Sequence, residues 1–363
     1  MTSMAKAPTA AAPARSDWID VAKGIGILLV VYGHVARGLM NGGVPMDRTW
    51  FSTVDATIYA FHMPLFFLLS GWFFLGSMTR RGPRDYLATR VATVLYPYVL
   101  WSLLQGGIEL AMSRYTSHPL QVSEVLALAW APRAQFWFLY ALFLISVIAL
   151  LMCVRHPRAG VVALTLTGAL LLATQQRDWP MPAALVASNL MYFALGAWLG
   201  SRALSPATVS RLALAGILVG ACGLAALMSL PPDGIAWPKL LKLAGATLGV
   251  SAAAWLAILL ATSASTRPIS ATLAALGRAS MAIFLAHILV ASGVRIVLIK
   301  GLGVTTPAAH LIAGLVLGTL LPWALWRAVQ GRAGMALFEL PNAWRQRLAG
   351  SPAARPARTL PAA

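Results

Sequence analysis

Charged residues are scarce in this chain of 363 residues, since Asp, Glu, Lys and Arg together make up 10% of it. A soluble domain carries roughly 25% charged residues, so the composition excludes an ordinary water-soluble globular protein. Hydrophobic residues make up 59% of the chain, and its mean hydropathy is +0.75. We therefore expect an integral membrane protein.

Cysteine is also nearly absent. The two cysteines, Cys153 and Cys222, both lie inside apolar runs. They supply neither a disulfide framework nor the ligand spacing of a metal site. We interpret both as apolar filler and expect no metal site.

Acidic residues are the scarcest charged class, 10 against 28 lysines and arginines, which gives a formal net charge of +18. Such an excess is typical of nucleic-acid-binding proteins when it is clustered on one surface. Here the basic residues are spread over the segments between apolar runs, as membrane topology requires. We therefore expect a lipid bilayer around this protein and no nucleic acid among its partners.

About ten apolar runs are long enough to cross a bilayer as helices. They predict an all-α, polytopic membrane bundle with both termini on one side. Most lysines and arginines fall in segments that are cytoplasmic if the termini are, and the positive-inside rule favours that orientation. The expected spans are 22–39, 57–76, 91–108, 136–154, 160–174, 183–200, 212–230, 241–262, 281–299 and 308–326.

The apolar runs form one transmembrane domain, 15–330, without an internal repeat or a separate soluble domain. Residues 1–14 are rich in Ala and Pro, which predicts disorder. A signal peptide is the competing interpretation, but a clear small-x-small cleavage site is missing. We expect residues 331–363 to form a basic, Pro-rich cytoplasmic tail that is disordered after Pro341.

His34 lies within the first apolar run, and an ionisable side chain at membrane depth is a functional candidate by default. Asp20 shares its helical face but stands ~21 Å away along the axis, so we expect Asp20 to pair with Lys23 or with an arginine of another helix. His62, in the second run, lies at a similar depth if the two helices are adjacent and antiparallel. Two histidines at one depth, beside a helix-kinking Pro64, favour a function over helix packing alone.

Arginines border the third run. A snorkelling arginine is the simplest interpretation, and it suits Arg80 and Arg81. Arg90 lies one helical turn deeper, where a guanidinium suits phosphate binding. His287 lies in the ninth run, roughly 10 Å from its inner end.

The remaining histidines, His118, His156 and His310, lie in loops or at helix ends, and we expect them to be solvated. An aromatic cluster around Trp137 opens the fourth run. Such clusters are usually anchors at the membrane interface.

Four segments together resemble the acyltransferase family 3 membrane proteins, in their fucose 4-O-acetylase-like branch. They follow the family order over most of the chain, and the family's ten-helix layout agrees with the apolar runs. The segments are Asp20-x-x-Lys-Gly-Ile-Gly-Ile…Gly-His34, Phe61-His-Met-Pro-Leu-Phe-Phe…Ser-Gly71, Arg90 with Tyr96-Pro-Tyr…Trp101 and Trp137-Phe-Leu, and Gly277-x-x-Ser-Met-Ala-Ile-Phe-Leu-x-His287.

The resemblance implies an O-acyltransferase that moves an acyl group, commonly acetyl from acetyl-CoA, to a hydroxyl of a carbohydrate or glycan. It places His34 at the family's essential first-helix histidine and Arg90 at the first arginine of an Arg-x-x-Arg pair. The second position is Thr93 here, so donor binding through a complete pair does not carry over. Lys23 stands where many relatives have arginine, although this branch often has lysine.

Acyl-CoA carries several negative charges and is made in the cytoplasm, so we expect Lys23, Arg84 and Arg90 to bind its phosphates. Its thioester arm would run between the helices toward His34, which takes the proton of the attacking hydroxyl as general base. His62 either orients His34 or the acceptor, or only packs between helices. An acyl-histidine intermediate fits the same residues.

We assign structural or orienting roles to Asp20, Ser70, Trp137 and His287. We expect no permanently bound cofactor, since acyl-CoA is a substrate, and we expect the protein in the inner membrane of a bacterium. The alternative is a transporter or flippase for a lipid-linked sugar, because ten spans and intramembrane ionisable residues fit that class too. The chain lacks the two-fold repeat of many such folds.

Overall fold

The structure is a computed structural model. The predicted all-α fold is confirmed: the described part of the chain holds no strand, and ten of its helical segments are long and apolar enough to cross a membrane. The chain is therefore a multi-pass membrane protein. The predictions for residues 1–14 and for His118 lie outside the described residues, which are 17–112, 120–176, 178–202, 204–230 and 237–350.

Most spans are single helices, and three combine shorter helices. Two further helices, α12 (Arg267–Arg278) and α15 (Asn342–Ala349), are too short to cross a bilayer. The spans comprise α1 (Asp17–Asn41); α2 (Arg48–Trp72) with α3 (Phe74–Arg81); α4 (Pro83–Arg90), a π-helical segment (Val91–Leu95) and α5 (Tyr96–Ala111); α6 (Val122–Leu126) and α7 (Trp137–Cys153); α8 (Pro157–Thr174); α9 (Met181–Gly200); α10 (Pro206–Met228); α11 (Trp237–Thr262); α13 (Ser280–Ile296); and α14 (Pro307–Val329).

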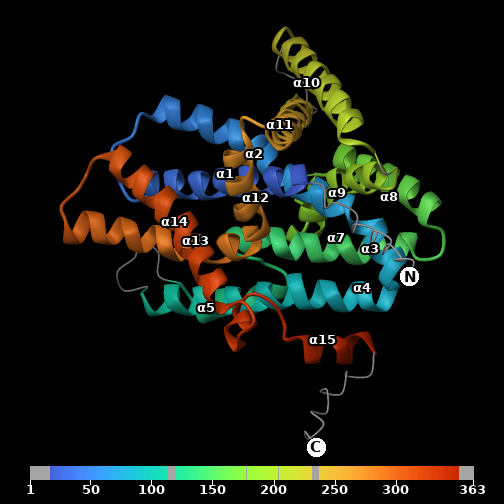
Figure 1. Cartoon of the computed structure of the whole chain (residues 1–363). Coiled ribbons are helices and arrows are strands. Elements are labelled where there is room, and N and C mark those ends of the chain that lie inside the picture. Colours follow the sequence, from blue (N-terminus) through green and yellow to red (C-terminus); the bar gives the residue numbers. More distant parts are fainter. Residues whose placement is uncertain (1–16, 113–119, 177, 203, 231–236, 351–363) are drawn as a thin grey trace, which may run out of the picture.

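The first helix, α1, lies inside the bundle, where it contacts α2, α11, α12, α13 and α14 (Figure 1). It is the most deeply buried of the spans, whereas α10 at the top of Figure 1 is the least buried. Residues 18–22 are buried without a break, and consecutive residues of a helix point to all of its sides, so α1 is enclosed as a helix of a protein interior is. Polar groups on α1 are thus surrounded by other helices.

The short helix α12 crosses α1 at close range through two glycines. A Cβ atom at Gly24 would overlap the backbone of Leu273, and one at Gly277 would overlap the carbonyl group of Asp20. Small residues at a crossing let two backbones approach closely inside a membrane. The approach also brings Nη1 of Arg278 to 3.9 Å from Oδ2 of Asp20.

The substitution Gly277→Ala is expected to lower the free energy of unfolding by about 1–3 kcal/mol, because the added methyl group overpacks this crossing. The measurement is thermal unfolding of the purified protein in detergent. Gly293→Ala is the matched control, since a Cβ atom at Gly293 meets no neighbouring atom within 4 Å. If the Gly277→Ala variant unfolds at the wild-type temperature, the close approach of α1 and α12 is wrong.

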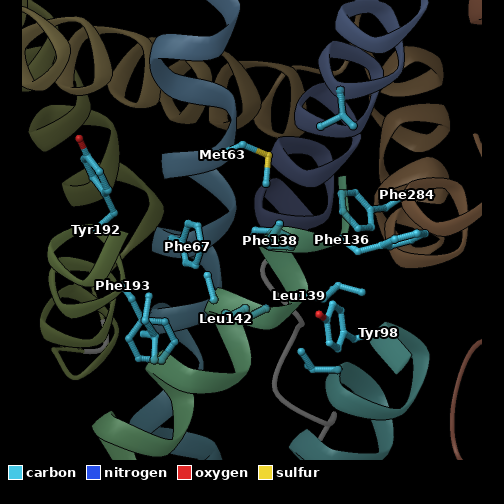
Figure 2. Close-up of a cluster of buried hydrophobic side chains, with 14 of the residues drawn as sticks. Met63, Phe67, Tyr98, Phe136, Phe138, Leu139, Leu142, Tyr192, Phe193 and Phe284 are labelled. Atoms are coloured by element: carbon cyan, nitrogen blue, oxygen red, sulfur yellow. The ribbon is translucent and has the colours of Figure 1, made fainter. Parts of the chain in front are cut away.

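Aromatic packing between α2, α7 and α13 holds the helices around α1 together. The ring of Phe138, on α7, lies 5.0 Å from the ring of Phe67, on α2, and 5.5 Å from the ring of Phe284, on α13, by their centroids. Figure 2 shows Phe138 between the other two side chains. Burial of such large apolar groups fixes the spacing of the three helices.

The C-terminal tail packs against the bundle. A 3-10 helix (Ala333–Leu337) accepts hydrogen bonds from Tyr96 and Trp101 of α5, and α15 contacts α4 (Figure 1). The prediction of disorder after Pro341 is therefore wrong for α15. The Pro- and Arg-rich composition of the tail does not reveal that it is ordered, because the hydrogen-bond donors that hold the tail, Tyr96 and Trp101, lie on a distant part of the chain.

Candidate active site

Three histidines from three helices gather inside the bundle, and we call them the histidine layer: His34 on α1, His62 on α2 and His287 on α13. Nε2 of His287 lies 3.3 Å from Nδ1 of His34. His62 approaches His34 through Tyr59, whose ring centroid is 4.5 Å from that of His62 and 6.4 Å from that of His34. His62 and His287 are fully buried.

The hydrogen bonds of the histidine layer define which ring nitrogen carries the proton. Each Nδ1 faces a main-chain carbonyl of its own helix, and a carbonyl oxygen only accepts hydrogen bonds. Each neutral ring therefore holds its proton on Nδ1, an assignment made from the hydrogen-bond network. The acceptors are Val30 for His34 at 2.9 Å, Ile58 for His62 at 2.7 Å, and Ile283 and Phe284 for His287 at 3.0 and 2.8 Å.

This proton arrangement leaves Nε2 of each ring as an acceptor. Nε2 of His287 then accepts the Nδ1–H of His34, which is shared with the Val30 carbonyl. Nε2 of His34 remains the basic nitrogen of the pair. This arrangement allows Nε2 of His34 to take up a proton or to act as a nucleophile. The hydrogen bond from Nδ1 of His34 to His287 stabilises the positive charge that either step leaves on the ring.

An ion pair lies beyond the histidine layer, toward the C-terminal end of α1. Arg37 donates from Nε and Nη2 to the two carboxylate oxygens of Asp55, at 2.7 and 2.8 Å. Its guanidinium carbon lies 3.3 Å from the centroid of the Tyr59 ring. The buried Tyr59 hydroxyl has no hydrogen-bond partner among the described residues, so it can donate to a bound group.

Arg37, Asp55 and Tyr59 were not predicted from the sequence. Asp55 and Tyr59 lie seven and three residues before the predicted His62, and these spacings place both on the same face of α2 as His62. That spacing is the signal that could have found them. The partner of Asp55, Arg37, lies one turn after His34 on α1 and shares its neighbourhood.

A cavity of about 590 Å³ lies on the other side of the histidine layer, and we call it the basic cavity. Three cationic side chains line it: Lys23, Arg90 and Arg278. Oδ1 of Asp20 lies 3.8 Å from Nζ of Lys23, and Oδ2 of Asp20 lies 3.9 Å from Nη1 of Arg278. The predicted pairing of Asp20 with Lys23 or an arginine of another helix is thus observed with both partners.

The basic cavity and the histidine layer share helix faces. On each of three helices, an apolar residue that lines the cavity is three, four or seven positions from a histidine of the layer, and such spacings put both on one face. Along the axis of α1, the lining residue Ile27 and the histidine His34 are ~10 Å apart. The pairs are Ile27 and His34 on α1, Phe66 and His62 on α2, and Phe284 and His287 on α13.

Arg90 ends α4, immediately before the π-helical segment. Its Nε donates to the hydroxyl of Tyr86 at 3.0 Å, and Tyr86 is itself buried. Nη1 and Nη2 of Arg90 have no hydrogen-bond partner in the described part of the chain. Single π-turns inside longer helices are frequent at functional sites, and this one places at the cavity a guanidinium that is held by Tyr86 through Nε and leaves its Nη atoms to face the cavity.

The other predicted site residues divide into two groups. Ser70 lines the basic cavity together with Lys23 and Arg90. Arg84 does not line it, because its guanidinium lies beside Gly350 at the end of α15. Trp137 does not line it either, and its ring packs on that of the neighbouring Phe138 at 6.4 Å.

His310 corrects a prediction. It is 1% exposed rather than solvated, and its Nε2 donates to the carbonyl of Val304 at 2.8 Å. The loop before α14 folds back over this histidine, which a position near a helix end does not reveal. His156, by contrast, is exposed as expected.

Comparison with known proteins agrees with the family resemblance of the sequence motifs. A family model described as an acyltransferase domain matches residues 16–327. Nodulation protein NolL of Mesorhizobium japonicum is 32% identical over 130 residues, which is 34% of this chain and 32% of that protein. NolL of Sinorhizobium fredii is 32% identical over 137 residues, 37% of this chain and 35% of that protein.

The matched stretch spans about a third of the length of these relatives, and no solved structure gives a significant match. The family model, in contrast, covers the histidine layer and all three cations of the basic cavity. This chain belongs to the acyltransferase family.

Proposed function

We propose that this protein is a membrane-bound O-acyltransferase that moves an acyl group, acetyl in the simplest case, from acyl-CoA to a hydroxyl of a carbohydrate or glycan. One observation carries the proposal: the basic cavity and the histidine layer lie on the same faces of α1, α2 and α13. The reaction needs an anion site for the donor and a base for the acceptor. The shared faces connect the two.

The donor occupies the basic cavity. Lys23, Arg90 and Arg278 bind its phosphates, because cationic donors that converge on one cavity suit a polyanion. The apolar side chains of Ile27 and Phe66 line the cavity on the helix faces that carry His34 and His62. The thioester carbonyl therefore comes to rest within reach of His34.

His34 acts as the general base. Its Nε2 takes the proton of the acceptor hydroxyl as the hydroxyl oxygen forms a bond to the thioester carbonyl carbon. The carbon–sulfur bond then breaks, and the leaving thiolate takes the proton back from Nε2, which yields an O-acyl ester and free CoA. The Nδ1–H bond to His287 stabilises the transient imidazolium, and the Tyr59 hydroxyl donates to the developing oxyanion.

The proposal places both termini in the cytoplasm, because acyl-CoA is supplied from that side, and it places the protein in the inner membrane of a bacterium. A reporter fused to the C-terminus tests this orientation. Green fluorescent protein fused there should fluoresce, and alkaline phosphatase fused there should be inactive in intact cells. The reverse pattern would place the basic cavity on the wrong side for acyl-CoA.

The substitution Arg90→Gln is expected to weaken binding of acetyl-CoA by about 10-fold, since a charge-assisted hydrogen bond to phosphate is lost. Isothermal titration of the detergent-solubilised protein measures the affinity. Arg84→Gln is the matched control, because that arginine lies beside Gly350 outside the cavity. Equal losses in the two variants would mean that the effect is one of general surface charge.

The proposal as a whole is tested with the purified protein in lipid nanodiscs and acetyl-CoA that carries a radiolabel on the acetyl group. Bacterial surface glycans and simple glycosides serve as acceptors. Label on the carbohydrate, with release of an equal amount of free CoA, is the expected result. Carbohydrate that crosses the bilayer of proteoliposomes without acquiring label would favour the transporter alternative.

A further inference from the structure

Part of the wall of the basic cavity comes from the C-terminal tail. Met335, Phe338 and Glu339 line this cavity together with residues of α1, α2, α7 and α13. We call residues 333–340 the C-terminal strap. The strap lies after residue 327, where the match to the family model ends, so this wall is a feature of the present chain that the family match does not assign.

Specific hydrogen bonds hold the strap against α5. The Tyr96 hydroxyl donates to the carbonyl of Ala336 at 2.8 Å, and Nε1 of Trp101 donates to the carbonyl of Leu337 at 2.6 Å. The ring of Phe338 stacks on that of Trp101, with centroids 6.0 Å apart and an angle of 24° between the planes. A segment tied by side-chain donors in this way has a fixed position.

The strap is also tied to the π-helical segment that follows Arg90. The main-chain N–H of Leu340 donates to the carbonyl of Ala92 at 3.0 Å. Ala92 lies within this π-turn, where the regular ladder of helix hydrogen bonds is interrupted. The strap thus supports the backbone next to the arginine of the cavity.

The charge of the strap opposes the charge of the cavity. Glu339 is the single acidic side chain among the residues that line it, which include the cations Lys23, Arg90 and Arg278. A carboxylate at this position attracts the cations and repels a phosphate group. Its presence therefore lowers the affinity of the cavity for a polyanion.

We propose that the C-terminal strap is part of the acyl-CoA site and controls how tightly CoA is held. Met335 and Phe338 form an apolar wall for the donor, and Glu339 weakens phosphate binding so that the CoA product can leave. The inference rests on the proposed function, since it assumes a CoA donor. The new element is that residues of the C-terminal strap, which lie after the part of the chain matched by the family model, contact the donor.

The test measures the affinity of unlabelled CoA for the full-length protein in detergent by isothermal titration. Glu339→Gln should tighten CoA binding roughly 2- to 10-fold at low salt, because one repulsive charge in the cavity wall is removed, and the gain should shrink at 0.5 M salt. Asp85→Asn is the matched control: it removes the same charge from the first turn of α4 but does not line the cavity, and it should leave the affinity unchanged.

Phe338→Ala should weaken CoA binding several-fold, and Phe338→Leu should restore most of it, because leucine keeps the apolar wall. Circular dichroism and thermal unfolding identify a variant that has lost its fold, and Glu339→Gln then decides alone. If the wild type binds CoA and Glu339→Gln binds it no more tightly, the strap proposal is overturned while the proposed function stands. If the wild type binds no CoA at all, the proposed donor is wrong and the strap proposal falls with it.

Discussion

The substitution His34→Gln is expected to reduce acyl transfer by about 10²- to 10⁴-fold, the usual contribution of a general base. Glutamine fills a similar volume and can still accept or donate a hydrogen bond near Val30 and His287, but its amide takes up no proton at neutral pH. The loss should therefore fall on the rate of transfer, with little change in acetyl-CoA affinity. Steady-state release of free CoA, detected with a thiol reagent, gives the rate.

His156→Gln is the matched control for His34, because His156 is exposed at the start of α8. It should retain the wild-type rate. A His34→Gln variant that folds and transfers acyl groups at an undiminished rate would remove His34 from the chemistry. A variant that loses both transfer and acetyl-CoA binding would instead assign His34 to the donor site.

The substitution His287→Leu is expected to lower kcat by about 5- to 150-fold, the range for loss of a buried hydrogen bond worth about 1–3 kcal/mol. Leucine fills the buried space but cannot accept the Nδ1–H of His34, so the imidazolium formed during transfer loses its support. The dissociation constant of acetyl-CoA should stay unchanged, because His287 does not line the basic cavity. In the proposed mechanism, His287 is therefore a positioning residue that acts through His34.

The conservative variant His287→Gln distinguishes this role from simple packing. Its side-chain oxygen can take the place of Nε2 and accept the hydrogen bond from His34, so it should recover a large part of kcat. If His287→Leu and His287→Gln are equally impaired, or if both lose thermal stability in proportion to activity, His287 serves only to pack α13 against α1.

The sequence was sufficient to predict the elements and the residues that act within one helix or between consecutive helices. The ten spans follow from apolar runs, and the pairing of Asp20 with Lys23 follows from their spacing within α1. His34 and His62 lie on consecutive spans, and their expected proximity is seen in the shared contact with Tyr59. Arg90 was predicted at the donor site from its depth and from the family resemblance, and it lines the basic cavity.

Contacts between helices far apart in the sequence could not be predicted in this way. His287 lies 253 positions after His34, and its place beside His34 depends on how α13 follows the glycine crossing of α12 with α1. Composition carries no information on that register. The same limit applies to the strap, since the donors on α5 that hold it are 236 and 240 positions away.

Arg84 shows the limit for charged residues at a membrane interface. Its position beside a basic loop suits phosphate binding as well as that of Arg90 does, yet α15 occupies the space beside its guanidinium. A single sequence does not reveal which basic side chain a folded tail will cover. Ser70, assigned an orienting role, lines the basic cavity because it shares a face of α2 with Phe66.

The central claim is that the donor binds in the basic cavity and reacts at His34, at two ends of one path. Its most direct test is a single turnover in which labelled acetyl-CoA is first bound to the protein and a carbohydrate acceptor is then added. The account predicts that His34→Gln binds labelled acetyl-CoA as tightly as the wild type and passes no label to the acceptor. Transfer of the bound label by this variant at the wild-type rate would contradict the account.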